Sequence, residues 1–442
     1  LEDEFSKIIK TESSEIIKVI GASGKGTEKS DADLQKVAGE LPIVRIVDTL
    51  IRHAILEGAS DIHIEPEEKD VVVRYRIDGI LKDVMTLPRE VHEGVVARVK
   101  VLANLKLDEH RLPQDGRFKI ESDGYKVSFR VSILPVYDGE KIVTRLLRED
   151  AEGFTLESLG YRGNALEVLH RAIKNPTGLV LATGPTGAGK TTTLYTILDI
   201  LNTPEVNIST IEDPIEYRMP RINQTQVKPD IGLTFANGLR TLVRQDPDII
   251  MVGEIRDNET AGLAINASLT GHLVVSSLHT NDAVGAIPRL MDMKIEPFLI
   301  SSTLSVVIAQ RLVRCLCPES REKYNLTKKE LESLSKEINL DKVLKILKQE
   351  KIISAKDTWE TIEFYRPKES DKCPKGYKGR MGIFEVLDVT AEIKDMINSS
   401  ASSEQLREKV ESTGMITMLE DGFMKAVQGL TSIEEVLRAS RE

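Results

Sequence analysis

The sequence predicts an α/β chain in which a C-terminal domain with a parallel-sheet core follows a smaller α+β domain. After residue 150, short apolar segments alternate with helical patterns, which is typical of a parallel sheet covered by helices. Before residue 150, the spacing of apolar residues changes from helical to a period of two and back. A chain of 442 residues, 40% of them hydrophobic, is long enough for two or three domains with sizeable cores.

The first domain is predicted over residues 41–150. Apolar residues recur at helical spacing over 41–58 and again over 91–103. Strands are expected over 61–64, 71–77, 118–120, 125–133 and 141–147. Residues 1–40 have few large apolar side chains and interleaved charges, so we expect a flexible lead-in. The chain begins at Leu1 rather than Met, which suggests a fragment or a processed product.

The second domain is predicted over residues 151–442. Its short apolar segments, 178–183, 206–211, 248–252 and 272–278, are expected to be strands of the parallel sheet. A cysteine-bearing subdomain is expected over 312–380, with a helical insert that begins at a capping box of Thr327 and Glu330. Residues 381–442 are predicted to be a helical tail, whose last helix has a second capping box, Ser432 and Glu435.

Composition excludes several classes of protein. No apolar stretch approaches the roughly 18 to 20 residues that span a bilayer, so we do not expect an integral membrane protein. The net charge of -10 gives no broad basic surface, so no nucleic-acid partner is expected. Three cysteines are too few for a disulfide framework and indicate a reducing, cytosolic compartment.

The strongest motif is a phosphate-binding loop, Gly184-Pro-Thr-Gly-Ala-Gly189-Lys190-Thr191, between a predicted strand and a predicted helix. Its glycines let backbone N–H groups turn toward phosphates, Lys190 neutralises phosphate oxygens, and the Thr191 hydroxyl is a ligand for Mg²⁺. A chance glycine-rich turn is the alternative, and the strand and helix on either side argue against it. The predicted nucleotide-binding residues are Gly184, Pro185, Thr186, Gly187, Ala188, Gly189, Lys190, Thr191 and Thr192.

Carboxylates follow two other predicted strands, whose ends converge on the same crevice in a parallel sheet. Glu212 and Asp213 follow the strand over 206–211, and Glu254 follows the strand over 248–252. We expect Glu254 to ligate Mg²⁺ with Thr191 or to orient a water molecule, Glu212 to assist at the metal, and Asp213 to lie at the nucleotide. The alternative is that these acidic residues simply solvate loops.

Two histidines bracket the fourth predicted strand, His272 before it and His279 after it. Either could sense the γ-phosphate by hydrogen bonding, although only the C-terminal end of the strand reaches the crevice directly. The alternative is a structural role, which is the commoner one for a lone histidine.

Several motifs in one order make the chain resemble the secretion ATPase superfamily, and specifically the type II secretion and type IV pilus assembly ATPases. The resemblance runs from about residue 41 to the C-terminus. It implies a RecA-like P-loop ATPase domain preceded by a PAS-like domain, in a homo-hexameric ring that binds ATP and Mg²⁺. Besides the phosphate loop, the motifs are Asp61-Ile-His-Ile-Glu-Pro66, Arg74-Tyr-Arg-Ile-Asp-Gly79, Leu112-Pro-Gln-Asp-Gly-Arg117, Glu212-Asp-Pro214, Gly238-Leu-Arg240, Arg244-Gln-Asp-Pro-Asp248 and Leu278-His-Thr-Asn-Asp282.

The resemblance also gives roles to four arginines. It implies that Arg117 and Arg130 of the smaller lobe approach the phosphates, and that Arg240 and Arg244 of the ATPase lobe lie near the nucleotide or a subunit contact. A guanidinium fork stabilises the negative charge that grows in the transition state of phosphoryl transfer. The alternative for each arginine is an ordinary surface ion pair.

The cysteines depart from the family pattern, which usually includes two cysteine pairs that bind Zn²⁺. Cys317 stands where the first pair begins but Ser320 occupies its partner's position, and Cys373 stands alone where the second pair is expected. With Cys315 as an irregular third thiol, we expect no zinc site. The alternative support for this subdomain is packing of the apolar residues of the insert, Leu331, Leu334, Ile338, Leu340, Val343, Leu344, Ile346 and Leu347.

The resemblance finally implies a cytoplasmic motor, peripherally associated with the inner membrane, that drives a platform protein in that membrane. Retraction motors of the family lack the insert, so an assembly motor is expected. Type IV pilus extension is the first hypothesis and type II secretion the second. A nucleotide switch without turnover and a scaffold with an inactive site are the alternatives from other classes.

Overall fold

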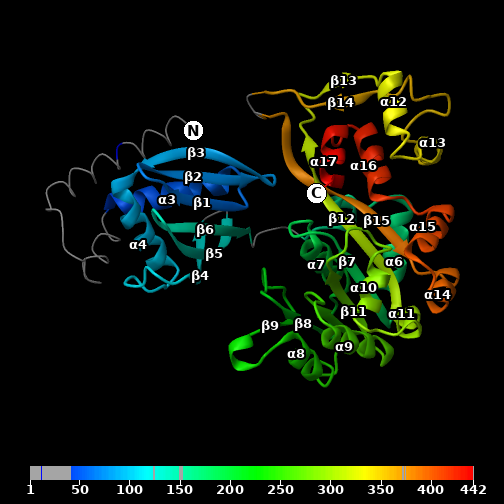
Figure 1. The fold of residues 1–442 in the computed structure, drawn as a ribbon, viewed down its shortest axis with the longest axis horizontal. Helices are drawn as coiled ribbons and strands as arrows, with labels where there is room; N and C mark the ends of the chain where they lie inside the picture. Colours follow the sequence, from blue (N-terminus) through cyan, green and yellow to red (C-terminus); the bar gives the residue numbers. More distant parts are fainter. Residues whose placement is uncertain are drawn as a thin grey trace. The chain divides into compact units, whose positions relative to one another are not determined.

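The computed structural model describes residues 41–122, 125–148, 153–370, 373 and 375–441, together with Thr11. The chain divides into two compact units, Leu1–Glu152 and Gly153–Glu442 (Figure 1). Apart from Thr11, the expected flexible lead-in over 1–40 lies outside the described residues.

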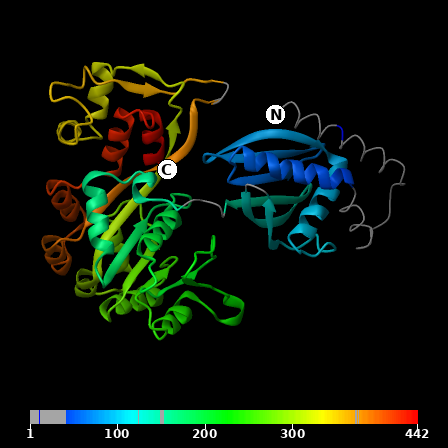
Figure 2. The same ribbon diagram turned by 180° about the vertical axis from the view of Figure 1, so that it is seen from behind.

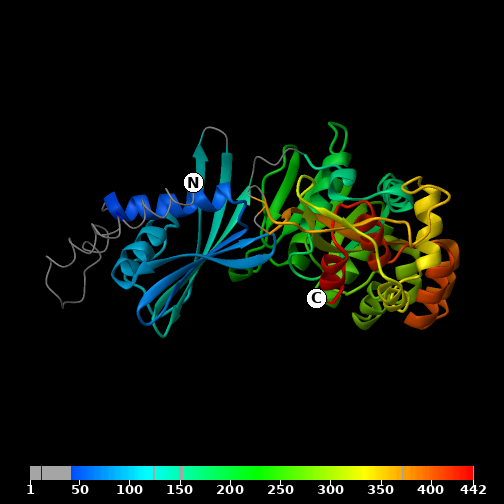
Figure 3. The same cartoon turned by 90° about the horizontal axis from the view of Figure 1, so that it is seen from above.

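The N-terminal unit contains a six-stranded antiparallel sheet in the order β3-β2-β1-β6-β5-β4. Two helices, α3 and α4, share one core with the inward-facing strand residues, so they cover the same face (Figures 2 and 3). The sequence pattern did not indicate β3. The elements are α3 (Leu41–Leu56), β1 (Asp61–Pro66), β2 (Asp70–Ile77), β3 (Ile80–Pro88), the 3-10 turn η1 (Arg89–Val91), α4 (His92–Leu102), β4 (Gln114–Ser122), β5 (Tyr125–Val136) and β6 (Gly139–Arg148).

A buried ion pair lies beneath the loop that joins α4 to β4. Lys100 on α4 contacts the Glu140 carboxylate at 2.7 Å, and their side chains are 1% and 9% exposed. Lys100 also donates to the Glu109 carbonyl at 2.7 Å, and His110 Nδ1 lies 2.7 Å from the second Glu140 oxygen. These contacts fix the loop that leads to Arg117 on β4.

The C-terminal unit contains a seven-stranded sheet in the order β15-β12-β7-β11-β10-β8-β9. Neighbouring strands are parallel except β15, which is antiparallel to β12. The strands are β7 (Gly178–Thr183), β8 (Ile208–Glu212), β9 (Ile222–Gln226), β10 (Ile249–Val252), β11 (Leu273–Leu278), β12 (Leu304–Leu316) and β15 (Tyr377–Asp388).

Helices cover both faces of this sheet. Leu179 and Leu181 of β7 belong to one core, which includes α8, α9, α10 and α11, whereas Val180 and Ala182 belong to a second core with α6 and α7. A strand buried on both faces has no polar alternation, which explains the continuous apolar runs in the sequence. The helices are α5 (Leu156–Leu159), α6 (Gly163–Ile173), α7 (Lys190–Leu201), η2 (Pro229–Ile231), α8 (Phe235–Leu242), α9 (Asn258–Leu269), α10 (Ala286–Asp292) and α11 (Pro297–Thr303).

The helical tail predicted over residues 381–442 was wrong in its first part, because residues 381–388 belong to β15. The strands β9 and β12 were also not predicted. β12 is buried along almost its whole length and runs directly on from α11, so the sequence shows neither alternation nor a turn there. Within residues 381–442 the helices all follow β15. They are α14 (Ala391–Asn398), α15 (Ser403–Ser412), α16 (Met418–Val427) and α17 (Ile433–Arg441).

The insert forms two helices, α12 (Lys328–Leu334) and α13 (Leu340–Gln349), beside the short pair β13 (Glu322–Tyr324) and β14 (Phe364–Arg366). Thr327 and Glu330 make the predicted capping box, and Asn339 caps α13 and so divides the insert in two. Leu334, Ile338, Val343 and Leu347 are buried in one core with Phe423 of α16 (Figure 1). Packing therefore supports this subdomain.

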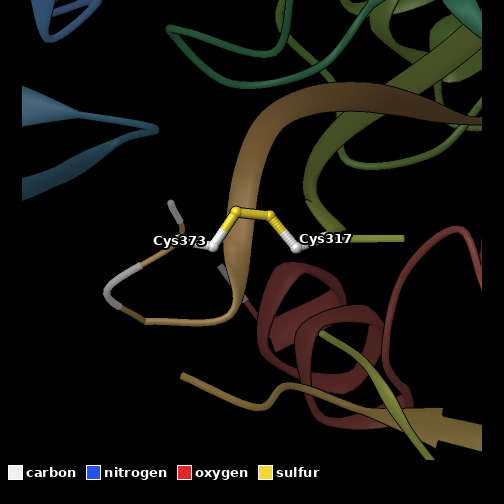
Figure 4. Close-up of a disulfide and its surroundings, with 2 residues drawn as sticks. All are labelled: Cys317 and Cys373. Atoms are coloured by element: carbon white, nitrogen blue, oxygen red, sulfur yellow. A yellow bond between two sulfur atoms is a disulfide. The ribbon is translucent and has the colours of Figure 1, made fainter. Parts of the chain in front are cut away.

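Cys317 and Cys373 are paired as a disulfide, with their Cα atoms 6.6 Å apart (Figure 4). The spacing of these cysteines in the sequence predicts isolated remnants of two pairs and no disulfide, and the structure corrects that expectation. Their separation of 56 residues in the chain hides their proximity, which depends on the insert folding back between them. Cys315 is not part of the disulfide and is partly exposed.

In the part of the chain that the structure describes, no helix combines the length and apolar character that crossing a membrane requires.

The buried pair in the N-terminal unit generates a stability prediction. Lys100→Met would leave the Glu140 carboxylate buried without its lysine, and breaking such a pair costs about 3–5 kcal/mol. Hydrogen exchange of peptides from β5 and β6, measured in the full chain, should report an opening free energy lower by about that amount. The control is the exposed Lys69→Met, for which a change within about 0.5 kcal/mol is expected. Equal protection in the two variants would contradict a stabilising role for the pair.

Candidate active site

The phosphate loop connects the end of β7 to the start of α7, as the motif predicted. Gly184, Gly187 and Gly189 have positive φ angles of 145°, 81° and 88°, a region that favours glycine. A Cβ atom on Gly184 would also lie 2.6 Å from the Gln310 carbonyl oxygen, so the loop packs directly on β12. Backbone N–H groups at the N-terminus of the twelve-residue helix α7 form a ready site for phosphate.

Lys190 folds back over the loop. Its Nζ donates to the carbonyl oxygens of Gly184 at 2.8 Å and Pro185 at 3.0 Å. Burial lowers the pKa of the Lys190 ammonium and Arg311 lowers it further, whereas the Glu254 carboxylate raises it. Lys190 is therefore held at the loop by acceptors that a phosphate would replace.

Gln310 supports the loop from below, a role that the sequence analysis missed. Its Nε2 donates to the Ala188 carbonyl at 2.8 Å, and its Oε1 accepts from Thr193 of α7 at 2.9 Å. Gln310 belongs to β12, and its side chain is buried beneath the loop. The role of Gln310 could have been predicted only from the pairing of β12 with β7, which the sequence pattern does not indicate.

Glu254 lies at the same edge of the sheet, beyond the end of β10. Its Oε2 is 3.2 Å from His279 Nε2, and its Oε1 is 2.6 Å from the guanidinium of Arg256. The Glu254 side chain is 13% exposed, and its charge acts on Lys190. The structure thus brings Lys190, Glu254 and His279 together. Arg256 was not predicted, although its position two residues after Glu254 places it in the same loop.

A threonine pair ties the phosphate loop to the segment after β11. Thr183, the last residue of β7, accepts from the Thr280 backbone N–H at 2.8 Å, and the two hydroxyl oxygens are 2.6 Å apart. The next residues are attached to the C-terminal helices and β15: Asp282 pairs with Arg407 of α15 at 2.6 Å, and the Ala283 N–H donates to Glu385 of β15 at 2.9 Å.

Glu212 closes β8, three strands away from β7, which corresponds to about 14 Å at normal strand spacing. The side chain is 2% exposed. Its carboxylate accepts from Thr210 at 2.5 Å, from Gln224 at 3.2 Å and from Tyr195 of α7. Glu212 is therefore part of a buried hydrogen-bond network behind the helix of the phosphate loop.

Other predicted residues are not brought to the phosphate loop within this unit. His272 precedes β11 at the opposite end from the loop, where its Nδ1 lies 2.9 Å from the Ala267 carbonyl, so it does not approach the phosphate loop within this unit. Its contact with a nucleotide stays a prediction. Arg240 on α8 pairs with Glu259, and Arg244 donates to the Arg240 carbonyl at 2.7 Å. Asp213 is exposed. Arg117 and Arg130 belong to the N-terminal unit, where they are cross-strand partners on β4 and β5.

Thr191 and Glu254 provide oxygens that suit a Mg²⁺ ion whose remaining ligands are phosphate and water oxygens. Among the described residues, no group of three or more histidine, cysteine or acidic side chains could hold a metal by itself. Mg²⁺ commonly takes one or two protein oxygens and completes its octahedron with water and substrate phosphates. The exposed Thr191 hydroxyl in the first turn of α7 and the Glu254 carboxylate supply oxygens of this kind.

Glu212 generates a prediction about pH. Burial raises the pKa of its carboxyl above the ordinary 4.5, although hydrogen bonds from Thr210, Tyr195 and Gln224 oppose this. Because the folded chain binds this proton more tightly, the stabilisation is complete below the ordinary pKa and is lost as pH rises through the raised pKa. The free energy of unfolding of the wild type, minus that of Glu212→Gln, should therefore fall as pH rises from about 4.5 to 8. Urea unfolding at a series of pH values measures this difference, and a constant difference would contradict the prediction.

Most of the chain is similar in sequence to proteins of one family. A family model described as "Type II/IV secretion system protein" matches residues 36–438. The chain is 46% identical over 411 residues to the Type II secretion system ATPase E of Vibrio cholerae, covering 93% of this chain and 78% of that protein. It is 43% identical over 413 residues to the Type IV pilus assembly ATPase PilB of Myxococcus xanthus, covering 93% and 70%.

Among solved structures, the pilus retraction motor PilT with bound ADP matches with a TM-score of 0.59 and 26% identity, covering 90% of this chain and 97% of that one. The predicted fold class, a RecA-like α/β domain after a smaller α+β domain, is confirmed. The chain is an ATP hydrolase that belongs to the type II/IV secretion system ATPases, the family that its motifs resemble.

Proposed function

We propose that this ATPase is the motor of a homo-hexameric ring that powers assembly of a type IV pilus. The observation that carries the proposal is the cluster of Lys190, Glu254 and His279 at the ends of parallel strands, because these groups suit turnover of bound ATP and not only its binding. The ring would be cytoplasmic, peripherally associated with the inner membrane, and would drive a platform protein there.

Each group in the cluster has a role that its chemistry supports. Lys190 and the loop N–H groups hold the phosphates, and Thr191 with Glu254 would hold Mg²⁺, which supplies charge neutralisation between phosphate oxygens. Glu254 also orients the attacking water and accepts its proton. His279, hydrogen-bonded to Glu254 at 3.2 Å, is placed to exchange that bond for one to the γ-phosphate.

Glu212 acts less directly than the sequence analysis assumed. Its carboxylate is occupied by buried donors, among them Tyr195 of α7, so we assign it to positioning the phosphate-loop helix. Arg117 and Arg130 would act on ATP bound by a neighbouring subunit, where two guanidinium groups stabilise the transferring phosphate. Arg240 and Arg244 would lie near the nucleotide or at the contact between subunits, and Asp213 would lie at the nucleotide.

Type II secretion is the second candidate. The relative from that system is 46% identical to this chain and the pilus assembly relative is 43% identical, a small difference in favour of secretion. The helical insert favours an assembly motor over a retraction motor but does not separate the two assembly systems. Pilus assembly therefore stays the first hypothesis and type II secretion the second.

Glu254→Gln tests the proposed hydrolysis step. Loss of the base should lower kcat for phosphate release by at least about a hundredfold, while a fluorescent ATP analogue still binds because the phosphate loop is intact. The exposed Glu205→Gln is the control and should keep the wild-type rate. Turnover retained in Glu254→Gln would remove Glu254 from the mechanism. An unchanged rate in Arg117→Ala would be a separate result, and it would favour a nucleotide switch that needs no arginine from a neighbour.

The dependence of ATP hydrolysis on protein concentration tests whether the active sites are shared between subunits of a ring. If arginines of a neighbour complete each site, phosphate release per subunit should rise as hexamers form. Steady-state rates and light scattering on the same samples measure both quantities. Full activity per subunit in a monomer would mean that one chain contains a complete site, which contradicts the shared-site motor.

A further inference from the structure

The cross-strand register of the N-terminal sheet aligns four arginines in one row. Arg117 on β4 is opposite Arg130 on β5, which is opposite Arg145 on β6. Arg145 is opposite Asp61 on β1, which is opposite Arg76 on β2. Directly opposed residues project from the same face of a sheet, so these five side chains form a continuous row, here called the arginine row.

The arginine row lies on the face that the helices leave uncovered. In β5 and β6 the residues next to the row in sequence, Phe129, Val131 and Leu146, are buried in the core with α3 and α4. Figures 2 and 3 show α3 and α4 on one face of the sheet. Because strand residues alternate between faces, the arginines belong to the opposite face.

The charges in the row are unevenly distributed. Asp61 is its one acidic member, and it contacts Arg145 Nε at 3.0 Å and Arg76 Nε at 3.6 Å. Ser60 also donates to Asp61 at 2.8 Å, which fixes the carboxylate. Arg130, by contrast, has an arginine opposite it on both neighbouring strands. Like charges in direct opposition destabilise a sheet, so this end of the row is suited to an anion.

Arg145 and Arg76 differ in the rest of their contacts. Arg76 Nη1 donates to the Gly79 carbonyl at 2.9 Å and so braces the turn between β2 and β3. Arg145 is 52% exposed and, within the described residues, its hydrogen bond to Asp61 uses Nε. A guanidinium carries five N–H donors, and a bond through Nε leaves the four N–H groups of its terminal nitrogens for other acceptors.

We propose that Arg145 is a third phosphate-binding arginine beside Arg117 and Arg130, and that Asp61 is a positioning residue that aims its guanidinium. Three arginines on adjacent strands span about 10 Å, which suits a polyphosphate chain better than a single phosphate. The inference rests on the proposed function, because the anion is the ATP bound by a neighbouring subunit. Asp61 acts by holding Nε while the terminal nitrogens bind phosphate oxygens.

The test is steady-state hydrolysis by full-length Arg145→Gln, Arg145→Lys, Asp61→Asn and the control Arg76→Gln. Arg145→Gln should lower kcat by about tenfold or more and change KM for ATP less, because the arginine stabilises charge that grows in the transition state. Arg145→Lys should recover part of the rate, since it keeps the charge but loses the fork. Arg76→Gln should stay within about twofold of the wild type, because its contacts are internal to the sheet.

Asp61→Asn should lower kcat less than Arg145→Gln, and the double variant should be no slower than Arg145→Gln alone, because Asp61 acts through Arg145. Additive effects would contradict the positioning role.

Mixing Arg145→Gln with Lys190→Ala subunits tests whether Arg145 acts on ATP bound by a neighbour. The mixture should give more activity than the two separate proteins, because the Arg145→Gln subunit supplies Lys190 and the Lys190→Ala subunit supplies Arg145.

Two results would overturn the inference, and a third would overturn the proposed function. A wild-type rate in Arg145→Gln, together with a slow Arg117→Ala, would exclude Arg145 and leave the proposed function intact. Equal losses in Arg145→Gln and Arg76→Gln, with weaker hydrogen-exchange protection of β6 in both, would make the row purely structural. Turnover retained in Glu254→Gln would instead show a failure of the proposed function, which makes the two failures distinguishable.

Discussion

The parallel register of the C-terminal sheet is the constraint on which the site depends. β7, β11, β10 and β8 are adjacent in that order and run in one direction, so their last residues all meet at one edge. Lys190, Glu254 and His279 lie far apart in sequence and become neighbours only through this register. The same register separates His272 from them, because that residue lies at the start of β11. Hydrogen bonds between strands, and not local contacts, therefore decide which polar groups can share a nucleotide.

The N-terminal unit uses the same rule with antiparallel strands. Strands distant in sequence place Arg117, Arg130 and Arg145 at one level of the sheet. A slip of one residue in any of these pairings would turn an arginine into the core and an apolar residue outward. The core beneath α3 and α4 thus fixes the level of the arginines, and the buried pair of Lys100 and Glu140 fixes the loop that precedes Arg117.

Local pattern was enough to predict much of this molecule. The phosphate loop, the strand ends at Glu254 and His279, and the capping box at Thr327 could be predicted because each depends on residues close together in sequence. Gln310, Arg256 and the pairing of Cys317 with Cys373 could not, because they depend on contacts that only the folded chain creates. β12 could not be predicted, because a strand that is buried on both faces shows no alternation of apolar and polar residues.

The bonds around Thr280 have a mechanical consequence. Thr183 joins the start of the phosphate loop to Thr280, and the next residues are attached to α15 through Arg407 and to β15 through Glu385. His279 is therefore connected in series with the C-terminal helices. A displacement of the backbone at His279 therefore either breaks these bonds or moves α15 and β15 with it, so the segment after β11 is mechanically coupled to both elements.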